Sequence, residues 1–164
     1  MKNNKGFTLI ELIATITILG IIMLVAIPNI MSTSIKSKNR TYLNDANKLV
    51  SLVKYKFESD AYINKPTTTD CLKITLNQLD QTELQKGPEG GTYDVSASYV
   101  IVRYDLNNRK YQYYVQIKEN YGANKNKGIK LVKYETILGS TNKYNLITSG
   151  GSWNNGVTEC SHYH

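Results

Sequence analysis

A single carboxylate, that of Glu11, lies near the start of the longest apolar run in the chain. The run from Phe7 to Ile27 contains no other charged residue. At ~1.5 Å per residue, a helix of this length crosses a ~30 Å hydrocarbon layer. A Glu near the start of such a span costs roughly 2.5 kcal/mol or more if it faces lipid unpaired. Its partner must therefore come from outside the run or from a new chain end.

A cut after Gly6 would create that chain end, because Phe7 would then carry an α-ammonium group. The amine would lie about four residues from the Glu11 side chain of its own chain, or it could dock against Glu11 of a neighbouring chain. In a low-dielectric environment such an ion pair attracts more strongly than it does in water. The chemistry that these residues offer is charge neutralisation inside an apolar environment.

The segment from Lys5 to Leu12 (Lys-Gly-Phe-Thr-Leu-Ile-Glu-Leu) resembles the class III signal of type IV pilins and their pseudopilin relatives. The resemblance implies that a membrane aspartyl peptidase, the prepilin peptidase, cuts between Gly6 and Phe7 and that the Phe7 amine is methylated. It also implies that Glu11 is the glutamate used in assembly. The similarity in detail covers about the first thirty residues, and beyond them it concerns overall shape.

Two further residues, Gly20 and Pro28, fall where the resemblance implies a weakened helix that can unwind as subunits pack. The apolar segment has two other interpretations. A secretory signal would need a small-x-small cleavage site after the apolar run, and Pro28-Asn29-Ile30-Met31 offers none. An ordinary membrane anchor would need neither the Gly6-Phe7 junction nor the glutamate.

The charge of the chain is compatible with an exported protein. The net charge is +7, from 20 basic and 13 acidic residues. Loss of Lys2 and Lys5 with the leader leaves 18 basic residues and a side-chain charge of +5. Basic residues flanking a membrane anchor favour the cytoplasmic side, so we expect the C-terminal part outside. The cysteines, Cys71 and Cys160, are then expected to form a disulfide, with two separate thiols as the alternative.

A helical pattern continues beyond Pro28. Apolar residues recur with helical spacing and define a single stripe, formed by Ile35, Tyr42, Ala46, Leu49, Val53 and Phe57. We expect one helix from Phe7 to about Ala61, rather than an anchor and a separate helix divided at the proline. Its first half is apolar on all sides and needs lipid or other helices, whereas its second half has one apolar face and needs a sheet.

The remaining residues predict a small antiparallel sheet. Strands are expected over Tyr93–Tyr104, over Tyr111–Lys118 after a hairpin turn at Asn107-Asn108, and over Ile129–Ile137. Thr75 is expected to cap a short helix that includes Leu76 and Leu79 and could extend to Leu84. Residues 142–156 are turn-rich, and a further short strand is possible near Thr158 to His162.

The predicted fold class is α+β, a long N-terminal helix packed against a small antiparallel sheet, in the lollipop shape that the resemblance also implies. The expected organisation is a leader at 1–6, a membrane-spanning or filament-core helix at 7–28, an amphipathic helix at 29–61 and a head at 62–164.

No catalytic motif is present, so neither enzymatic activity nor a cofactor is expected. Cys160-x-His162-x-His164 could place three metal ligands on one side of a strand, but we expect a tail with a bonded cysteine and no metal. Tyr114, Tyr121 and Lys125-Asn126-Lys127 could form a weak contact for single-stranded nucleic acid, with an ordinary exposed loop as the alternative.

We therefore expect a type IV pilus subunit with roles in adhesion and surface motility. It would be a single-pass precursor in the cytoplasmic membrane and extracellular when assembled. Its partners would be its own copies, minor pilins, the prepilin peptidase and the assembly platform. The alternatives are a minor pilin, or a pseudopilin of a type II secretion or DNA-uptake machine, although no acidic calcium loop of the major secretion pseudopilins is evident. A membrane-tethered protein that binds DNA or glycan is a further alternative.

Overall fold

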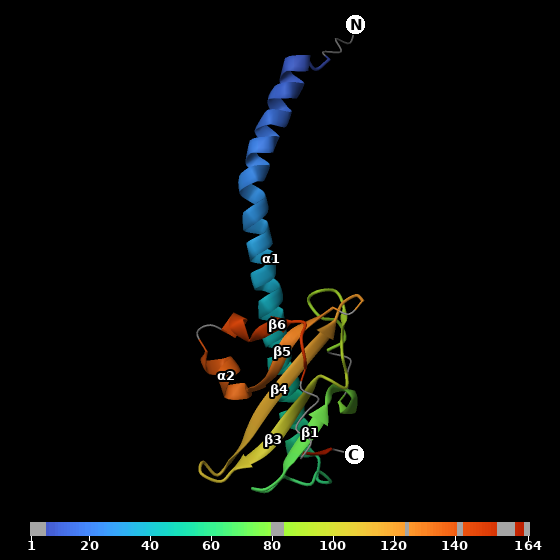
Figure 1. The fold of residues 1–164 in the computed structure, drawn as a ribbon, viewed down its shortest axis with the longest axis vertical. Coiled ribbons are helices and arrows are strands. Elements are labelled where there is room, and N and C mark those ends of the chain that lie inside the picture. Colours follow the sequence, from blue (N-terminus) through green and yellow to red (C-terminus); the bar gives the residue numbers. More distant parts are fainter. Residues whose placement is uncertain (1–5, 80–83, 124, 141–142, 154–159, 163–164) are drawn as a thin grey trace. The chain divides into compact units, whose positions relative to one another are not determined.

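The computed structural model describes residues 6–79, 84–123, 125–140, 143–153 and 160–162. Residues 161 and 162 are described by their backbone alone. The chain forms two units, residues 1–37 and 38–164. One helix, α1 (Leu9–Ser59), contributes to both units and includes Pro28 (Figure 1). The prediction of an uninterrupted helix is confirmed, and its end lies two residues before the expected Ala61.

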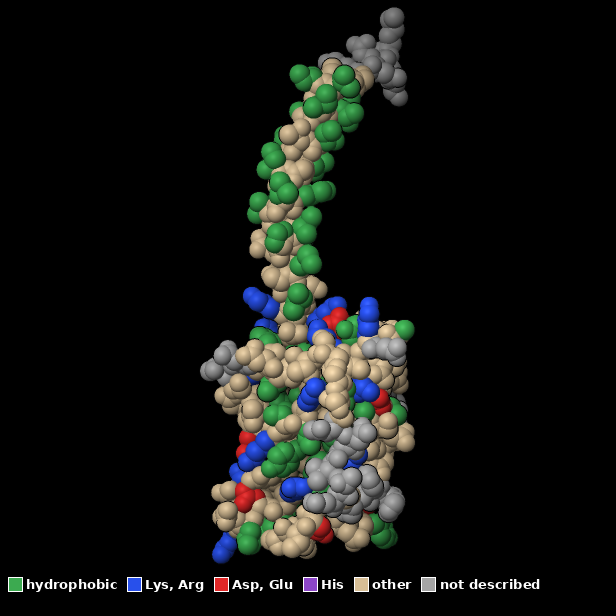
Figure 2. All heavy atoms as spheres, in the orientation of Figure 1, with side chains coloured by type: hydrophobic (Ala, Val, Ile, Leu, Met, Phe, Trp, Pro, Cys, Tyr) green, Lys and Arg blue, Asp and Glu red, His purple; other side chains and the backbone are tan. Residues whose placement is uncertain are grey.

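The first unit is apolar on every side of its helix. Its large hydrophobic side chains, from Phe7 to Ile35, are all more than half exposed, and Figure 2 shows them along the length of the helix. This is the one helix among the described residues that is long and apolar enough to cross a membrane. Within the described residues nothing buries the apolar segment, so its cover must be lipid or another molecule.

The second unit contains one sheet of seven strands, counted over the described residues, in the order β6-β5-β4-β3-β1-β7 with β2 paired to β4. The bounds are β1 Cys71–Thr75, β2 Thr92–Tyr93, β3 Tyr99–Asp105, β4 Lys110–Asn120, β5 Asn126–Lys133, β6 Ile147–Ser149 and β7 Ser161–His162. All neighbours are antiparallel except β1 and β7, which are parallel. The expected antiparallel meander corresponds to β3, β4 and β5, which form the centre of the sheet. The predicted α+β class is confirmed.

The C-terminal half of α1 covers one face of this sheet. Its buried side chains are Tyr42, Leu43, Ala46, Leu49, Val50, Val53 and Phe57, and they share a core with strand residues such as Val100, Val115 and Ile129. The predicted stripe is therefore the buried face from Tyr42 onward. Ile35 is exposed, because it belongs to the first unit. On the opposite face of the sheet, a smaller cluster contains Tyr99, Ile101 and the two cysteines.

The expectation of one strand over Tyr93–Tyr104 was wrong, because Asp94 interrupts it. The carboxylate of Asp94 accepts hydrogen bonds from the backbone N–H groups of Ser96 (3.2 Å) and Ala97 (3.0 Å) and from the Ser96 hydroxyl (2.8 Å). These bonds favour a turn over an extended strand. Its other oxygen accepts from Lys118 Nζ at 3.0 Å, which fixes the turn to β4.

The expected strand at Ile129–Ile137 was too long. β5 ends at Lys133, and Tyr134–Gly139 forms the short helix α2, which buries Ile137. Lys143–Leu146 then forms the 3₁₀ helix η3 before β6 pairs with β5. The possible strand near Thr158 to His162 is described only as β7, and Thr158 lies outside the described residues.

The segment after α1 contains a strand that the sequence did not predict. β1 is short and directly follows a polar loop, yet its first four residues are buried. Thr75 begins the 3₁₀ helix η1 (Leu76–Gln78), and the Gln78 side chain accepts from the Thr75 backbone N–H at 2.8 Å. The short helix predicted after Thr75 is thus confirmed over three residues. Cys71 of β1 forms the predicted disulfide with Cys160.

A buried carboxylate, that of Glu119 in β4, fixes the glycine-rich connection before β2. Glu119 is fully buried and accepts from the Gly91 N–H (2.7 Å), the Glu89 N–H (3.1 Å) and the Tyr42 hydroxyl of α1. A Cβ at Gly87 would lie 2.1 Å from the Glu119 carboxyl carbon, so only glycine fits that close approach. The buried charge is stabilised because several donors point at it.

We predict that Asp94 stabilises the second unit above pH 4. Burial opposes its ionisation, but the hydrogen bonds from Ala97, Ser96 and Lys118 outweigh burial and lower the pKa from 3.8 to about 2. A lowered carboxyl pKa contributes stability above the unfolded value and loses it as pH falls through the folded value. Asp94→Asn should thus reduce the free energy of unfolding by about 2 kcal/mol at pH 7, and most of the difference should be lost by pH 2, where the folded-state carboxyl is half protonated.

The measurement is urea unfolding of the full chain in detergent micelles at pH 7, 4 and 2, followed by the fluorescence of Trp153, the single tryptophan. Glu58→Gln is the matched control, because it removes a charge from an exposed position on α1. An Asp94→Asn difference that stays constant from pH 7 to pH 2 would show that ionisation of Asp94 does not stabilise the fold.

Candidate functional site

The candidate site is the start of α1, where Thr8 and Glu11 bond to each other reciprocally. The Glu11 Oε2 atom accepts from the Thr8 backbone N–H at 2.8 Å and from the Thr8 hydroxyl at 2.8 Å. In return the Thr8 hydroxyl oxygen accepts from the Glu11 N–H at 3.3 Å. Thr8 immediately precedes the first helical residue, and Glu11 is the third. The two side chains therefore form a capping box.

The capping box was missed by the sequence interpretation, which treated Glu11 only as a charge in an apolar run. Its signal was present as Thr8-Leu9-Ile10-Glu11 before a hydrophobic segment, which is the pattern of a helix start. The box gives the carboxylate two hydrogen bonds at the positive end of the helix dipole. It supplies no full counter-charge, so the box orients the charge of Glu11 without neutralising it.

Cleavage after Gly6 would leave the capping box intact. Its groups belong to Thr8 and Glu11, and the Thr8 N–H lies in the Phe7–Thr8 peptide bond, which the cut spares. Phe7 is 85% exposed, and a Cβ built at Gly6 meets no atom within 4 Å. Phe7 is therefore exposed among the described residues, and an amine formed there would lie one residue before the cap.

The two residues expected to weaken the helix, Gly20 and Pro28, both lie within α1. Glycine lowers helix propensity by about 1 kcal/mol relative to alanine, and proline lacks the N–H that would bond to the carbonyl four residues earlier. Hydroxyl and amide side chains bond to backbone oxygens nearby: Asn29 Nδ2 to Val25 O (3.2 Å), Ser32 to Asn29 O (3.0 Å), Thr33 to Asn29 O (2.9 Å), Thr15 to Leu12 O (2.8 Å) and Thr17 to Ile13 O (2.7 Å). The unwinding role itself stays a prediction.

The residues of the possible nucleic-acid patch lie apart in the structure. Tyr114 lies in the middle of β4, packs beside the smaller cluster and bonds to Gln112, whereas Tyr121 and Lys125 lie in the connection to β5. Lys127 is paired with Glu89 at 2.6 Å. The three elements of the patch therefore do not form one surface.

The possible metal ligands at the C-terminus include a cysteine that is already bonded. Cys160 is in the disulfide, so it offers no thiolate to a metal. His164 and the side chain of His162 lie outside the described residues. Among the residues that the structure does describe, no three His, Cys, Asp or Glu side chains are grouped as a metal site requires.

The N-terminal segment matches a known family model. Residues 1–27 match the prokaryotic N-terminal methylation motif. This range contains Gly6, Phe7, the capping box and most of the exposed apolar segment. No solved structure matches the chain significantly.

Three curated relatives are similar to the chain over about half of its length or less. The type IV wide pilus major component PilA4 of Thermus thermophilus is 38% identical over 38% of this chain and 48% of the relative. The type II secretion system core proteins G of Klebsiella pneumoniae and Vibrio cholerae are 30% and 29% identical, each over 56% of this chain, and over 64% and 61% of the relatives. The matched part of the chain thus spans 48% to 64% of the length of these relatives, less than two thirds in each case.

We predict that removal of the Thr8 hydroxyl loosens the first turn of α1. Loss of an N-cap side chain costs about 1 kcal/mol of helix stability, so Thr8→Val should speed hydrogen exchange of the Glu11 amide roughly fivefold. The measurement is hydrogen exchange of the full chain in detergent micelles, followed by NMR. Thr8→Ser is the matched control because it keeps the hydroxyl, and equal exchange in Thr8→Val and the parent chain would contradict the capping role.

Proposed function

We propose that the chain is a filament subunit of a type IV pilus, on the basis of its N-terminal methylation motif and its similarity to a type IV pilin and to type II secretion core proteins G. In this proposal the prepilin peptidase cuts after Gly6 and the new Phe7 amine is methylated. The precursor is held in the cytoplasmic membrane by the apolar half of α1 with the second unit outside. The subunits then polymerise with copies of themselves and minor pilins on an assembly platform, for adhesion and surface motility.

The observation that carries the proposal is the continuity of the methylation motif with an apolar helix that nothing in the described chain covers. A helix of this kind needs lipid before assembly and other helices afterwards. At roughly 25 cal/mol per Å², a few hundred Å² buried per neighbour contributes several kcal/mol before association costs are subtracted. The same apolar surface can therefore serve as membrane anchor and as filament core.

Glu11 is the group that we assign to subunit registration. The capping box satisfies its hydrogen bonds but leaves its charge, which is costly in an apolar environment. The amine of a processed Phe7 would supply the counter-charge. At 4 Å such a pair gains about 4 kcal/mol at an effective dielectric constant of 20, against about 1 kcal/mol in water. The chain's role in this proposal is structural, with no catalytic step.

A pseudopilin of a type II secretion system is the second candidate. It is favoured by the two core proteins G, because they align with a larger share of this chain than PilA4 does. Immunogold electron microscopy with antibodies against the second unit separates these functions. Labelling along surface fibres supports a major pilin, labelling at fibre tips supports a minor pilin, and secretion defects without labelled surface fibres support a pseudopilin.

The first prediction from this proposal concerns processing. Gly6→Arg places a long cationic side chain at the scissile bond and should block cleavage. The exported chain would then be heavier by the six leader residues, as measured by mass spectrometry of the intact protein. Asn4→Arg is the matched control, because it adds the same side chain within the leader but away from the scissile bond. A Gly6→Arg chain that still begins at Phe7 would refute the cleavage assignment.

The second prediction separates the charge of Glu11 from its role as a cap. Glutamine retains the capping interaction but carries no charge, whereas valine loses both. We therefore expect Glu11→Gln and Glu11→Val alike to leave the chain in the membrane and to deplete it from sheared filaments by roughly tenfold or more, since an uncompensated buried partner is strongly destabilising. Western blots of membrane and sheared fractions measure the ratio, and normal assembly of Glu11→Gln would rule out ion pairing.

A further inference from the structure

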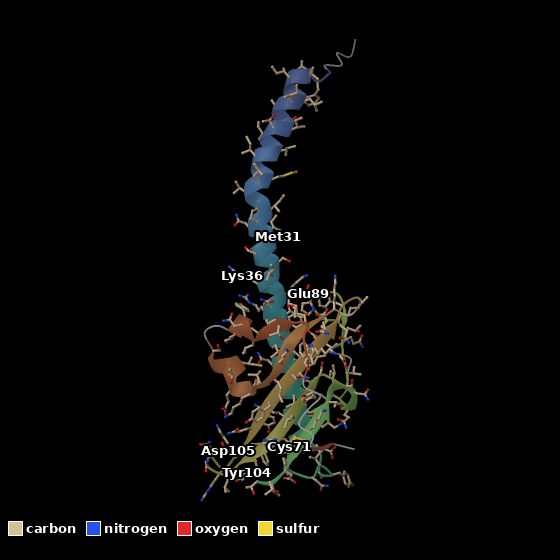
Figure 3. All side chains as sticks on the ribbon, viewed as in Figure 1. Met31, Lys36, Cys71, Glu89, Tyr104 and Asp105 are labelled. Atoms are coloured by element: carbon tan, nitrogen blue, oxygen red, sulfur yellow. A yellow bond between two sulfur atoms is a disulfide. The ribbon has the colours of Figure 1, made fainter. Side chains whose placement is uncertain are left out.

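Two adjoining clefts lie in the second unit where β3 ends and β4 begins. The first has a volume of about 270 Å³ and is lined by residues that include Asp70, Arg103, Asp105, Gln112 and Tyr114. The second has a volume of about 300 Å³. Figure 3 shows Cys71, Tyr104 and Asp105 at the end of this unit opposite Glu89.

The two clefts share Thr68 and Tyr104 and thus form one groove, which we call the hairpin-end groove. The second cleft adds Lys65, Pro66 and Tyr111. The rings of Tyr104 and Tyr111 meet edge to face, with centroids 5.2 Å apart, which fixes the boundary between the clefts. The groove therefore has two compartments in a row, with aromatic side chains at and beside their boundary.

The polar side chains of the first cleft are held in place before any ligand binds. The Tyr114 hydroxyl donates to Gln112 Oε1 at 3.1 Å, and Gln112 Nε2 donates to the Asp105 carboxylate. Asp105 also accepts from the Asn108 side chain at 2.6 Å and from the backbone N–H groups of Asn107 and Asn108. A network fixed in this way loses little conformational entropy on binding.

Arg103 leaves most of its donors available to the same cleft. The one hydrogen bond of its guanidinium within the described residues is to the Cys71 sulfur at 3.7 Å, and sulfur is a weak acceptor. No carboxylate of the described residues lies within ion-pair distance of it. A guanidinium carries five N–H donors, and the half-buried side chain is well placed to donate to ligand oxygens.

The charges of the groove indicate a neutral ligand. Lys65 and Arg103 are balanced by Asp70 and Asp105, so a polyanion gains little net attraction there. The lining combines donors, acceptors and tyrosine rings without a deep apolar centre. A ligand that fits has many hydroxyl groups, apolar ring faces to lie against tyrosine and a repeating unit for two successive compartments.

We propose that the hairpin-end groove binds a neutral oligosaccharide, with adjoining sugar units in its two compartments. Arg103 and Gln112 bond to the hydroxyls of one unit, Asp105 holds Gln112 in place, and Tyr104 lies between the units. The proposal goes beyond filament formation and does not depend on it, because the groove belongs to the second unit alone.

The test is glycan-array binding with the full chain in a zwitterionic detergent, chosen because its headgroup contains no sugar. The array carries neutral chains, among them oligomers of N-acetylglucosamine, mannose and galactose, together with heparin fragments. Any neutral oligosaccharide that is retained is then titrated by calorimetry. Arg103→Gln and Gln112→Ala should each raise its Kd roughly tenfold, the loss expected for one hydrogen bond to a charged or fixed polar group.

Arg40→Gln is the matched control, since it removes an exposed arginine of the same unit that lies outside the groove, and it should leave the Kd unchanged. Circular dichroism and the intact disulfide confirm that each variant is folded. The proposal is overturned if no neutral chain is retained, if Arg103→Gln binds as the parent does, or if heparin alone is retained and Arg40→Gln weakens it equally. Such a result would leave the processing and assembly experiments untouched.

Discussion

The structure depends on one constraint: apolar surface must be buried away from water, and an isolated charge in an apolar environment must be paired. The two halves of the continuous helix α1 meet this constraint in different ways. From Tyr42 onward it presents a single apolar face, and that face is buried by the sheet of its own chain. From Leu12 to Ile27 it is apolar on every side and has no cover within the described residues. The first half of the helix can therefore be stable only in lipid or among other helices.

Two carboxylates of the second unit, those of Glu119 and Glu89, are covered by groups of their own chain. Glu119 is buried within the second unit, and its bonds come from two backbone N–H groups and a tyrosine of α1. Burial and this carboxylate together raise the pKa of Tyr42 above its usual range, so the hydroxyl stays a donor. Nearby Glu89 is also partly buried, but hydrogen bonds from Lys127 and Lys38 outweigh burial and lower its pKa. The internal network is satisfied by its own chain.

Glu11 differs from these carboxylates, because its own chain satisfies its hydrogen bonds but does not supply a counter-charge. The capping box fixes the carboxylate at the helix start, and the remaining requirement is a positive charge in an apolar environment. A processed N-terminus is a source of such a charge that no internal residue of the apolar run provides. Folding of the second unit and assembly through the first can in this way be independent, which agrees with the division of the chain into two units.

The sequence by itself determined the features that depend on local pattern. The length and apolarity of the first segment, the stripe from Tyr42 to Phe57 and the hairpin after Asp105 all follow from residue type and spacing. The spacing of Thr8 and Glu11, three residues apart, also predicts the capping box. These features need no knowledge of distant residues, because a helix face or a hairpin turn is set by neighbours along the chain.

Tertiary structure alone decided the features that depend on residues distant in the sequence. β1 and β7 are short, and their strand conformation is stabilised by pairing with partners that no local pattern reveals. Asp94 breaks a promising strand because Lys118 and the turn amides reach it, and Glu119 is buried because Gly87 and Gly91 allow a loop to approach. The hairpin-end groove combines residues 65–71, 103–105 and 111–114, and the fold, with its disulfide, brings these segments together.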